Sequence, residues 1–270
     1  MIPPVSTPLL NGISMKLHLN RNDASAYHSN SQIARVLTET WIAQNMYCPR
    51  CGNTCLHHLK NNQPVADFDC PICGNQYELK SKNGSLGRKI PGGSYTSMIE
   101  RITSNKNPDF LIMNYCKKDM TIKNLIFIPK HFFTPDIIEK RKPLSARAHR
   151  AGWTGCNILI EKIPEQGRIY IISKGVISNQ TSIIDTFKKI KKIKIDNIAG
   201  RVWLMDILKC INSIHDIYFT LNDLYAFEHN LQLKHPNNHN IKAKIRQQLQ
   251  ILRDNNFLSF IKRGYYKKLI

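Results

Sequence analysis

The sequence contains CPRC at residues 48–51, PVADFDCPIC at 64–73 and YELKSK at 77–82. The fold can be interpreted from this stretch. It contains four cysteines in two CxxC pairs, which are Cys48 with Cys51 and Cys70 with Cys73. Eighteen residues separate the pairs, a spacing typical of a site in which two turns each supply two sulfurs to one zinc ion. We therefore predict a structural Zn²⁺ site, and because four thiolates close the coordination shell, this zinc has no catalytic share.

The residues around the second cysteine pair carry a different chemistry. If residues 76–80 form a strand, Glu78 and Lys80 share one face, because successive side chains point to opposite sides. Asp67 lies on the preceding strand of the same hairpin, and carboxylate oxygens are ligands for hard cations. These three residues are candidates for a metal-dependent hydrolytic centre. Asp69 shares a strand face with Asp67, and the pattern alone does not exclude it.

The chain is strongly basic. Its 270 residues include 39 Lys and Arg against 19 Asp and Glu, which gives a formal net charge of +20. Such an excess concentrates around polyanions, because each phosphate contact releases condensed counterions. The charge favours a nucleic acid as partner, with a merely basic soluble protein as the alternative. The length allows one large or two modest domains.

The cysteine pattern also indicates the compartment. Four of the eight cysteines form CxxC pairs and the others are scattered, which favours metal binding in a reducing cytosol over disulfides. We expect a cytoplasmic protein that does not enter a membrane, since no run approaches the roughly 18 apolar residues of a span. Residues 1–14 lack the basic start of a secretory signal and are predicted to be a flexible extension, with Met15 as a candidate start.

Hydrophobic periodicity predicts a mixed α/β region over residues 15–195. An apolar stripe that includes Leu37 and Trp41 predicts a helix from Ser29, with Ser31 as its N-cap. Glu39 on this helix is either an accessory carboxylate or, more simply, an exposed helix-face acid. A second helix is predicted at 95–103, and strands at 76–80, 109–115, 124–128, 157–160 and 168–172. The glycine-rich residues 83–94 lack a P-loop pattern and are predicted to be a connection.

A basic and aromatic segment lies between the predicted strands. Arg147 and Arg150 precede Trp153, an arrangement that suits DNA contact through phosphates and through packing of a base or methyl group on the indole. A buried core tryptophan is the alternative interpretation. The lysine-rich residues 181–195 are predicted to be a helix end or a charged linker.

Residues 196–270 predict three helices followed by a hairpin, the order of a winged helix. The helices are predicted at 201–214, at 221–231 with Thr220 as cap, and at 240–254. The third helix has an apolar stripe, and we expect its other face to present side chains that can pair with base edges: Lys244, Arg246, Gln247, Gln248, Gln250 and Arg253. A three-helix protein-interaction module is the alternative.

With these motifs assembled, the chain resembles the methyl-directed restriction endonucleases of the DpnI family from about Met15 onward. The segments PVADF, ELKSK, RAGWTGCNI and KIRQQLQILRD and the four paired cysteines carry the resemblance. It implies a PD-(D/E)XK nuclease domain with the zinc site over 15–195 and a winged-helix DNA-binding domain over 196–270. The literal PD dipeptide is absent, because two residues separate Pro64 from Asp67.

The resemblance implies a metal-dependent type II deoxyribonuclease that cuts double-stranded DNA at adenine-methylated GATC sites. It implies that Asp67, Glu78 and the carbonyl of Leu79 bind Mg²⁺, while Lys80 orients water or stabilises charge on the phosphate. Trp153 and the third C-terminal helix are the candidate niches for the methyl group. We expect a monomer. The alternatives are a zinc-containing transcription regulator without catalysis, a methylation-insensitive nuclease and an RNA-binding zinc protein.

Overall fold

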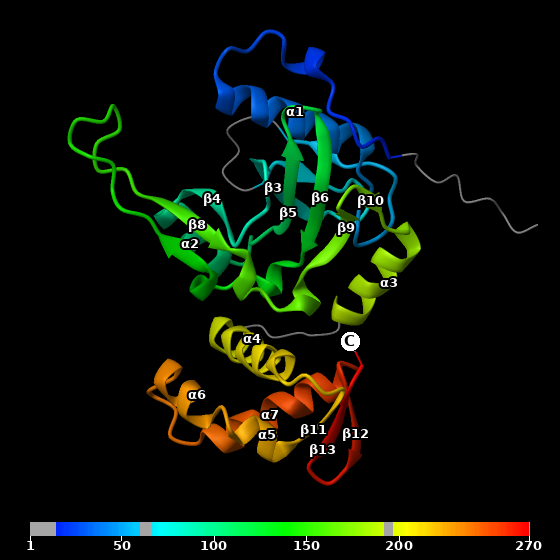
Figure 1. Ribbon diagram of the computed structural model, residues 1–270, viewed down its shortest axis with the longest axis vertical. Coiled ribbons are helices and arrows are strands. Elements are labelled where there is room, and N and C mark those ends of the chain that lie inside the picture. Colours follow the sequence, from blue (N-terminus) through cyan, green and yellow to red (C-terminus); the bar gives the residue numbers. More distant parts are fainter. Residues whose placement is uncertain (1–14, 60–65, 192–196, 270) are drawn as a thin grey trace, which may run out of the picture.

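The computed structural model describes residues 15–59, 66–191 and 197–269 (Figure 1). The extension predicted at residues 1–14 lies outside the described residues, as do Pro64 and part of the lysine-rich segment. The chain forms a mixed α/β part built on a central sheet, followed by a helical part with a small sheet of its own (Figure 1). None of the helices in these described ranges is long and apolar enough to cross a bilayer.

A seven-stranded sheet forms the centre of the first part. Its order over the described residues is β1 (His57–His58), β2 (Phe68–Asp69), β3 (Gln76–Asn83), β5 (Asp109–Cys116), β6 (Thr121–Ile128), β9 (Ile169–Ser173) and β10 (Val176–Ile177). β3 and β5 pair in parallel, and the neighbouring pairs are antiparallel. The predicted apolar strands lie at the middle of this sheet, where seven of the eight residues of β5 and five of the eight residues of β6 are buried.

Helices cover one face of the central sheet. α1 (Asn30–Asn45) crosses the sheet at the top of Figure 1, and the Thr38 hydroxyl donates to the Ser81 hydroxyl of β3 at 3.2 Å. α3 (Gln180–Lys191) places Phe187 against Phe127 of β6, with ring centroids 5.6 Å apart. The predicted cap of α1 is wrong by two positions, because the helix begins directly after Ser29 and Ser31 lies in its first turn.

The other face carries α2 (Tyr95–Thr103), as predicted, and a second sheet in the order β4 (Lys89–Ser94), β8 (Gly155–Leu159), β7 (Ile138–Lys140). The prediction that residues 83–94 are only a connection is wrong, since β4 pairs with β8. Glycine is required at position 92 because a Cβ there would lie 2.5 Å from the Cys156 sulfur. Short 3₁₀ turns complete this part: η1 (Arg21–Ala24), η2 (Lys130–Phe132), η3 (Pro135–Ile137), η4 (Ile160–Lys162) and η5 (Glu165–Gly167).

The C-terminal part has the predicted order of helices and hairpin. It contains α4 (Ile198–Ser213), β11 (Tyr218–Thr220), α5 (Leu221–Tyr225), α6 (Glu228–Lys234), α7 (Ile241–Asp254), β12 (Leu258–Lys262) and β13 (Tyr265–Lys268). Thr220 caps α5 as predicted, since its hydroxyl accepts from the Asp223 N–H and the Asp223 carboxylate accepts from the Thr220 N–H. The helix predicted at 221–231 is interrupted, because Phe227 adopts a turn conformation with φ −86° and ψ 2°.

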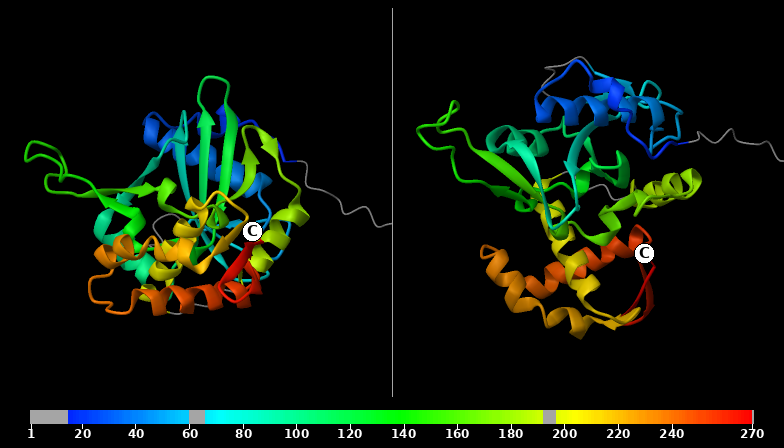
Figure 2. Two further views of the ribbon diagram at one scale, coloured as in Figure 1. Left: turned by 60° about the horizontal axis from the view of Figure 1, so that its bottom comes forward. Right: turned by 45° about the horizontal axis from the view of Figure 1, so that its top comes forward.

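The helix α4 lies against the first part, and α7 lies beyond it (Figures 1 and 2). Lys209 of α4 has its ammonium 3.4 Å from the Asp136 carboxylate of η3. Asn212 exchanges two amide hydrogen bonds with Gln166 of η5, at 3.0 and 3.1 Å. Polar contacts therefore join the C-terminal part to the lower edge of the α/β part.

Candidate active site

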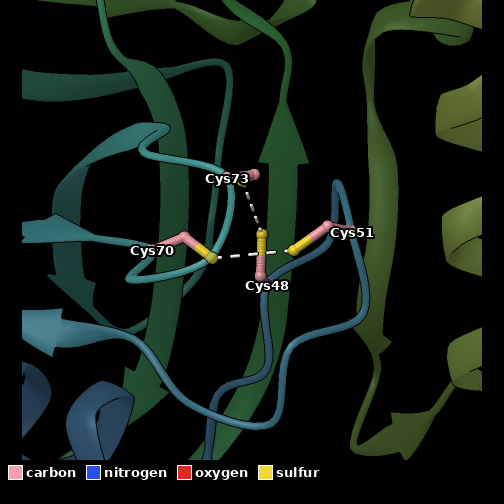
Figure 3. A group of neighbouring side chains, drawn as sticks. All are labelled: Cys48, Cys51, Cys70 and Cys73. Carbon is pink, nitrogen blue, oxygen red and sulfur yellow. Dashed lines mark hydrogen bonds between the residues drawn. The ribbon is translucent and has the colours of Figure 1, made fainter.

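Two turns bring the four predicted zinc ligands together (Figure 3). All four sulfurs lie within 4.8 Å of one another, with 3.7 Å between Cys48 and Cys73 and 3.6 Å between Cys51 and Cys70. These distances exceed a disulfide bond and fit a tetrahedral zinc site, where a Zn–S distance of about 2.3 Å places sulfurs about 3.8 Å apart. Within the described ranges this is the one cluster of three or more such groups that can hold a metal ion.

The two cysteine turns have the same local sequence, CPxCGN. In the first turn the Cys48 N–H donates to the Asn53 carbonyl at 2.7 Å, and Gly52 adopts a positive φ of 83° that favours glycine. In the second turn the Cys70 N–H donates to the Asn75 carbonyl at 2.9 Å. The repeated glycine and asparagine are therefore a sequence signal for this zinc-type turn, beyond the cysteine spacing.

A buried ion pair fixes the first cysteine turn to the central sheet. The Arg50 guanidinium donates twice to the carboxylate of Asp109, at 2.5 and 3.0 Å, and Asp109 is fully buried at the start of β5. The same carboxylate accepts from the Asn75 amide and the Lys130 N–H, each at 2.8 Å. No local sequence pattern predicts this contact, because Arg50 and Asp109 lie far apart in the chain.

The predicted hydrolytic residues converge beside the cysteine turns. Asp67 lies immediately before β2, and its carboxylate accepts the Leu79 N–H of β3 at 2.7 Å. Glu78 and Lys80 lie on the same face of β3 and their side chains form an ion pair. Asp69 lies farther along the hairpin, where its carboxylate is 3.9 Å from the imidazole of His57. The geometry thus favours Asp67 over Asp69 as the partner of Glu78.

The carboxylates of this centre interact electrostatically. Burial raises the pKa of Asp67, and the Lys80 charge and the Leu79 N–H lower this pKa in part, while Glu78 and Glu39 raise it. Glu39 on α1 is therefore near the centre, with its side chain only 13% exposed and one oxygen 3.0 Å from the His58 imidazole. The interpretation of Glu39 as an exposed helix-face acid is wrong, because its side chain is largely buried, and its role as an accessory carboxylate stays a prediction.

Arg101 of α2 is a member of this centre that the sequence did not indicate. One of its guanidinium nitrogens, Nη1, forms an ion pair with Glu78. Glu78 is 6% exposed and contacts Lys80 through its other oxygen. Two cations therefore share one buried carboxylate. Residue 101 carries no motif and is brought to β3 by tertiary packing, which explains why periodicity could identify α2 but not this contact.

The helix face predicted to contact DNA bases lies on α7. Its apolar stripe is buried as predicted, and Arg246, Gln247, Gln250 and Arg253 are exposed. Lys244 is half-buried, with its ammonium 5.9 Å from the centre of the Trp203 ring. The prediction for Gln248 is wrong, because this residue falls three positions after Ile245 in the apolar stripe and is only 1% exposed.

A basic hairpin projects from the small sheet between β7 and β8 (Figures 1 and 2). Arg147 and Arg150 are exposed on it. Trp153 is half-buried at its base, with the Arg150 guanidinium carbon 4.9 Å from the ring centre. A Cβ at Gly155 would lie 2.8 Å from the indole, so glycine is needed for the ring to pack there. The alternative of a buried core tryptophan is wrong.

Two family profiles match the chain. The DpnI profile, described as the Dam-replacing family, matches residues 15–196, and the DpnI_C profile, described as the Dam-replacing HTH domain, matches residues 199–268. The chain belongs to the DpnI family. Membership confirms the resemblance found from the motifs, and the HTH profile agrees with the winged helix predicted for the C-terminal part. It indicates a methyl-dependent restriction endonuclease, and the cluster of four cysteines in this DpnI-family chain can hold zinc.

Proposed function

We propose that the protein is a type II restriction endonuclease that cuts double-stranded DNA at GATC sites with N6-methylated adenines. The reaction is Mg²⁺-dependent hydrolysis of a phosphodiester bond. The observation that carries this proposal is the convergence of Asp67, Glu78 and Lys80 at one point of the central sheet, with Asp67 fixed by the Leu79 N–H at 2.7 Å. Membership of the DpnI family supports the same class of reaction.

The chemistry of the donor set fits a hard cation. In this proposal the carboxylates of Asp67 and Glu78 and the main-chain carbonyl of Leu79 hold Mg²⁺ through oxygen. Burial raises the pKa of Asp67, and a cation bound next to that carboxylate would lower its pKa again by favouring the ionised form. Bound Mg²⁺ supplies polarisation of the scissile phosphate and a lower pKa for water. Lys80 orients the attacking water or stabilises charge that develops on the phosphate.

The methyl mark is read, in this proposal, at two places. Trp153 can pack its indole against a methyl group, with Arg147 and Arg150 on neighbouring phosphates. The exposed face of α7 can lie in the major groove, where the adenine N6 position is accessible. Gln248 is left out of this surface because it is buried. Two readers in one chain raise discrimination, because binding at one increases the effective DNA concentration at the other.

The zinc cluster and the compartment complete the proposal. Zn²⁺ on Cys48, Cys51, Cys70 and Cys73 stabilises the hairpin that positions Asp67 and Glu78 and takes no part in hydrolysis. None of the eight cysteines, all of which lie in the described ranges, forms a disulfide, which fits the reducing cytoplasm in which we place the enzyme. We propose that it acts there as a monomer on DNA that carries a methyl mark absent from the host.

The experiment that tests this function is cleavage of matched duplexes. The protein is incubated with Mg²⁺ and with GATC duplexes that are unmethylated, methylated on one strand or methylated on both, and the products are separated on a gel. We expect cleavage of the duplex methylated on both strands and at most trace cleavage of the unmethylated one. Equal cutting of both would indicate a methylation-insensitive nuclease, and absence of cutting would favour a DNA-binding regulator.

The role of α7 is tested by binding. Arg246→Ala should weaken binding of the methylated duplex about tenfold, since a bidentate base contact contributes about 1–3 kcal/mol. Lys188→Ala on α3 is the control, because it removes one exposed positive charge outside the C-terminal part. Fluorescence anisotropy at one fixed salt concentration gives both dissociation constants. Equal affinity of the two variants would remove Arg246 from the base-reading surface.

A further inference from the structure

We propose that Arg101 binds the scissile phosphate and is a further catalytic residue of the centre formed by Asp67, Glu78 and Lys80. This inference rests on the proposed nuclease function and adds a residue that neither the motif nor the family profiles assign. Arg101 reaches the centre from α2, so it approaches Glu78 from a different element than Lys80 does.

The guanidinium of Arg101 is only partly used in the structure. Its Nη1 pairs with one oxygen of Glu78, while Nε and Nη2 are buried and have no hydrogen-bond partner among the described residues. A guanidinium has five N–H donors in a planar fork, and buried donors without partners are rare in native proteins. A planar fork with free donors matches the geometry of two phosphate oxygens. The unused donors therefore indicate a missing anionic ligand.

The charge balance around Glu78 points to the same ligand. One carboxylate is shared by Lys80 and Arg101, whose side chains are 20% and 17% exposed. The single negative charge of Glu78 cannot balance the two positive charges that contact it. A DNA phosphate supplies the anion that this cluster lacks.

The position of the centre in the fold also fits a contact with the sugar–phosphate backbone of DNA. Burial raises the pKa of the Cys156 thiol on β8, and the charges of Lys80, Glu78 and Arg141 also act on it, so all three lie near Cys156. Arg141 begins the basic hairpin that projects from the small sheet. Arg101 thus lies where Glu78 of β3 approaches the root of this hairpin, and a duplex that follows the hairpin inward would bring a phosphate to Arg101.

With a cation bound, the Glu78 carboxylate would serve as one of its ligands, and Arg101 would lose Glu78 as its acceptor. The Arg101 fork then donates to the non-bridging oxygens of the phosphate that Lys80 also approaches. There it stabilises the extra negative charge that develops as water attacks. The rival interpretation is that Arg101 only positions Glu78 for metal binding, and the two roles predict different kinetics.

Single-turnover cleavage of the doubly methylated GATC duplex separates these roles. At saturating Mg²⁺ we expect Arg101→Gln to cleave about 100-fold more slowly than the wild-type protein, because one charged transition-state donor is lost. Arg101→Lys should fall between them, since an ammonium keeps the charge but not the fork. If the rate of Arg101→Gln rises to the wild-type rate as Mg²⁺ is titrated up to saturation of the variant, Arg101 has only a positioning role and the proposal is overturned.

The matched control is Arg168→Gln. Arg168 is also mostly buried, with its side chain 23% exposed and its Nε without a partner in the described part of the chain, but it lies at η5 and β9. We expect its cleavage rate to stay within about twofold of the wild-type rate, since changes away from functional groups have small effects. Zinc content and melting temperature measured on both variants show whether each has folded.

A binding measurement with Ca²⁺ in place of Mg²⁺ tests the contact without turnover. The duplex carries a neutral methylphosphonate at the phosphate that the wild-type protein cuts. The methylphosphonate should weaken binding by the wild-type protein about tenfold more than binding by Arg101→Gln, because the variant has already lost the charge-assisted hydrogen bonds of Arg101 and keeps only Lys80 at this phosphate. Equal weakening of both proteins would show that Arg101 does not contact this phosphate. A wild-type protein that cuts no duplex would instead overturn the proposed nuclease function itself.

Discussion

The thiolate cluster and the carboxylate centre lie side by side in residues 48–80 and differ in how they are held. The four sulfurs lie within 4.8 Å of one another in two repeated turns closed by backbone hydrogen bonds. In the carboxylate centre, Asp67 has a raised pKa, and Arg101 has donors without partners in the described ranges. The comparison teaches that one cluster is built for stability, while the other holds unsatisfied charge of the kind found at functional sites.

The largest expected effect comes from breaking the thiolate cluster. Cys70→Ser should lower the free energy of unfolding by about 5 kcal/mol or more, because metal binding at such sites contributes directly to folding. Denaturant unfolding and zinc content measure this change. Cys55→Ser is the control, since Cys55 is exposed and outside the cluster. A Cys70→Ser protein with unchanged metal content and melting temperature would contradict a structural zinc site.

The second expected effect concerns the ion pair that joins the first cysteine turn to β5. Asp109→Asn should cost about 3–5 kcal/mol, because it leaves the Arg50 charge buried without its partner. Asp185→Asn, at an exposed ion pair with Lys188, should change stability little. Urea unfolding of both variants makes the comparison. Equal stabilities would show that the zinc turns do not depend on their attachment to the sheet.

The third effect depends on pH and concerns His131 of η2, which interacts with the charge of Arg50 in the first cysteine turn. Burial, with the charges of Arg50, Arg201 and Lys130, lowers the pKa of His131 to about 3 from 6.5. The neutral folded form stabilises the protein fully above pH 6.5, and this contribution falls by about 1.4 kcal/mol per pH unit below it, down to about pH 3. The loss at pH 5 is therefore about 2 kcal/mol.

Replacing His131 should flatten this dependence. His131→Gln should lose less stability between pH 7 and pH 5 than the wild-type protein, whatever its stability at pH 7. Urea unfolding at pH 7, 6 and 5 gives the slopes, with His149→Gln at an exposed position as control. Parallel slopes for the wild type and His131→Gln would show that His131 is not the buried neutral group.

The smallest effect concerns Asp67 in the carboxylate centre. Its contribution to stability falls as pH rises, whereas that of His131 increases with pH. Burial raises the pKa of Asp67, so ionisation of this side chain disfavours the folded state above its ordinary pKa. In Mg²⁺-free buffer, Asp67→Asn should therefore raise the melting temperature slightly at pH 7, and the gain should vanish toward pH 4. Asn keeps an oxygen acceptor for the Leu79 N–H. A lower melting temperature at pH 7 would make Asp67 a structural residue.

Local patterns predicted much of the fold and of the site. Cysteine spacing, strand alternation and helical periodicity are local, and they placed the four sulfurs, the face shared by Glu78 and Lys80, and the helices α2 and α7. What they missed depends on distant contacts. β4 forms because it pairs with β8, and Arg101 joins the centre because α2 packs there. Gln248 was wrongly predicted to contact DNA, because it is a polar residue that lies in the buried apolar stripe of α7.

We propose that the thiolate cluster stabilises the fold and that the carboxylate centre carries out hydrolysis. The most direct test is the cleavage rate of Asp67→Asn, measured on the doubly methylated GATC duplex at saturating Mg²⁺. We expect the rate to fall about 10³-fold, while zinc content and methylated-duplex binding stay at wild-type values. Cleavage within tenfold of the wild-type rate, in a variant with normal zinc content, would contradict the assignment of the chemistry to the carboxylates.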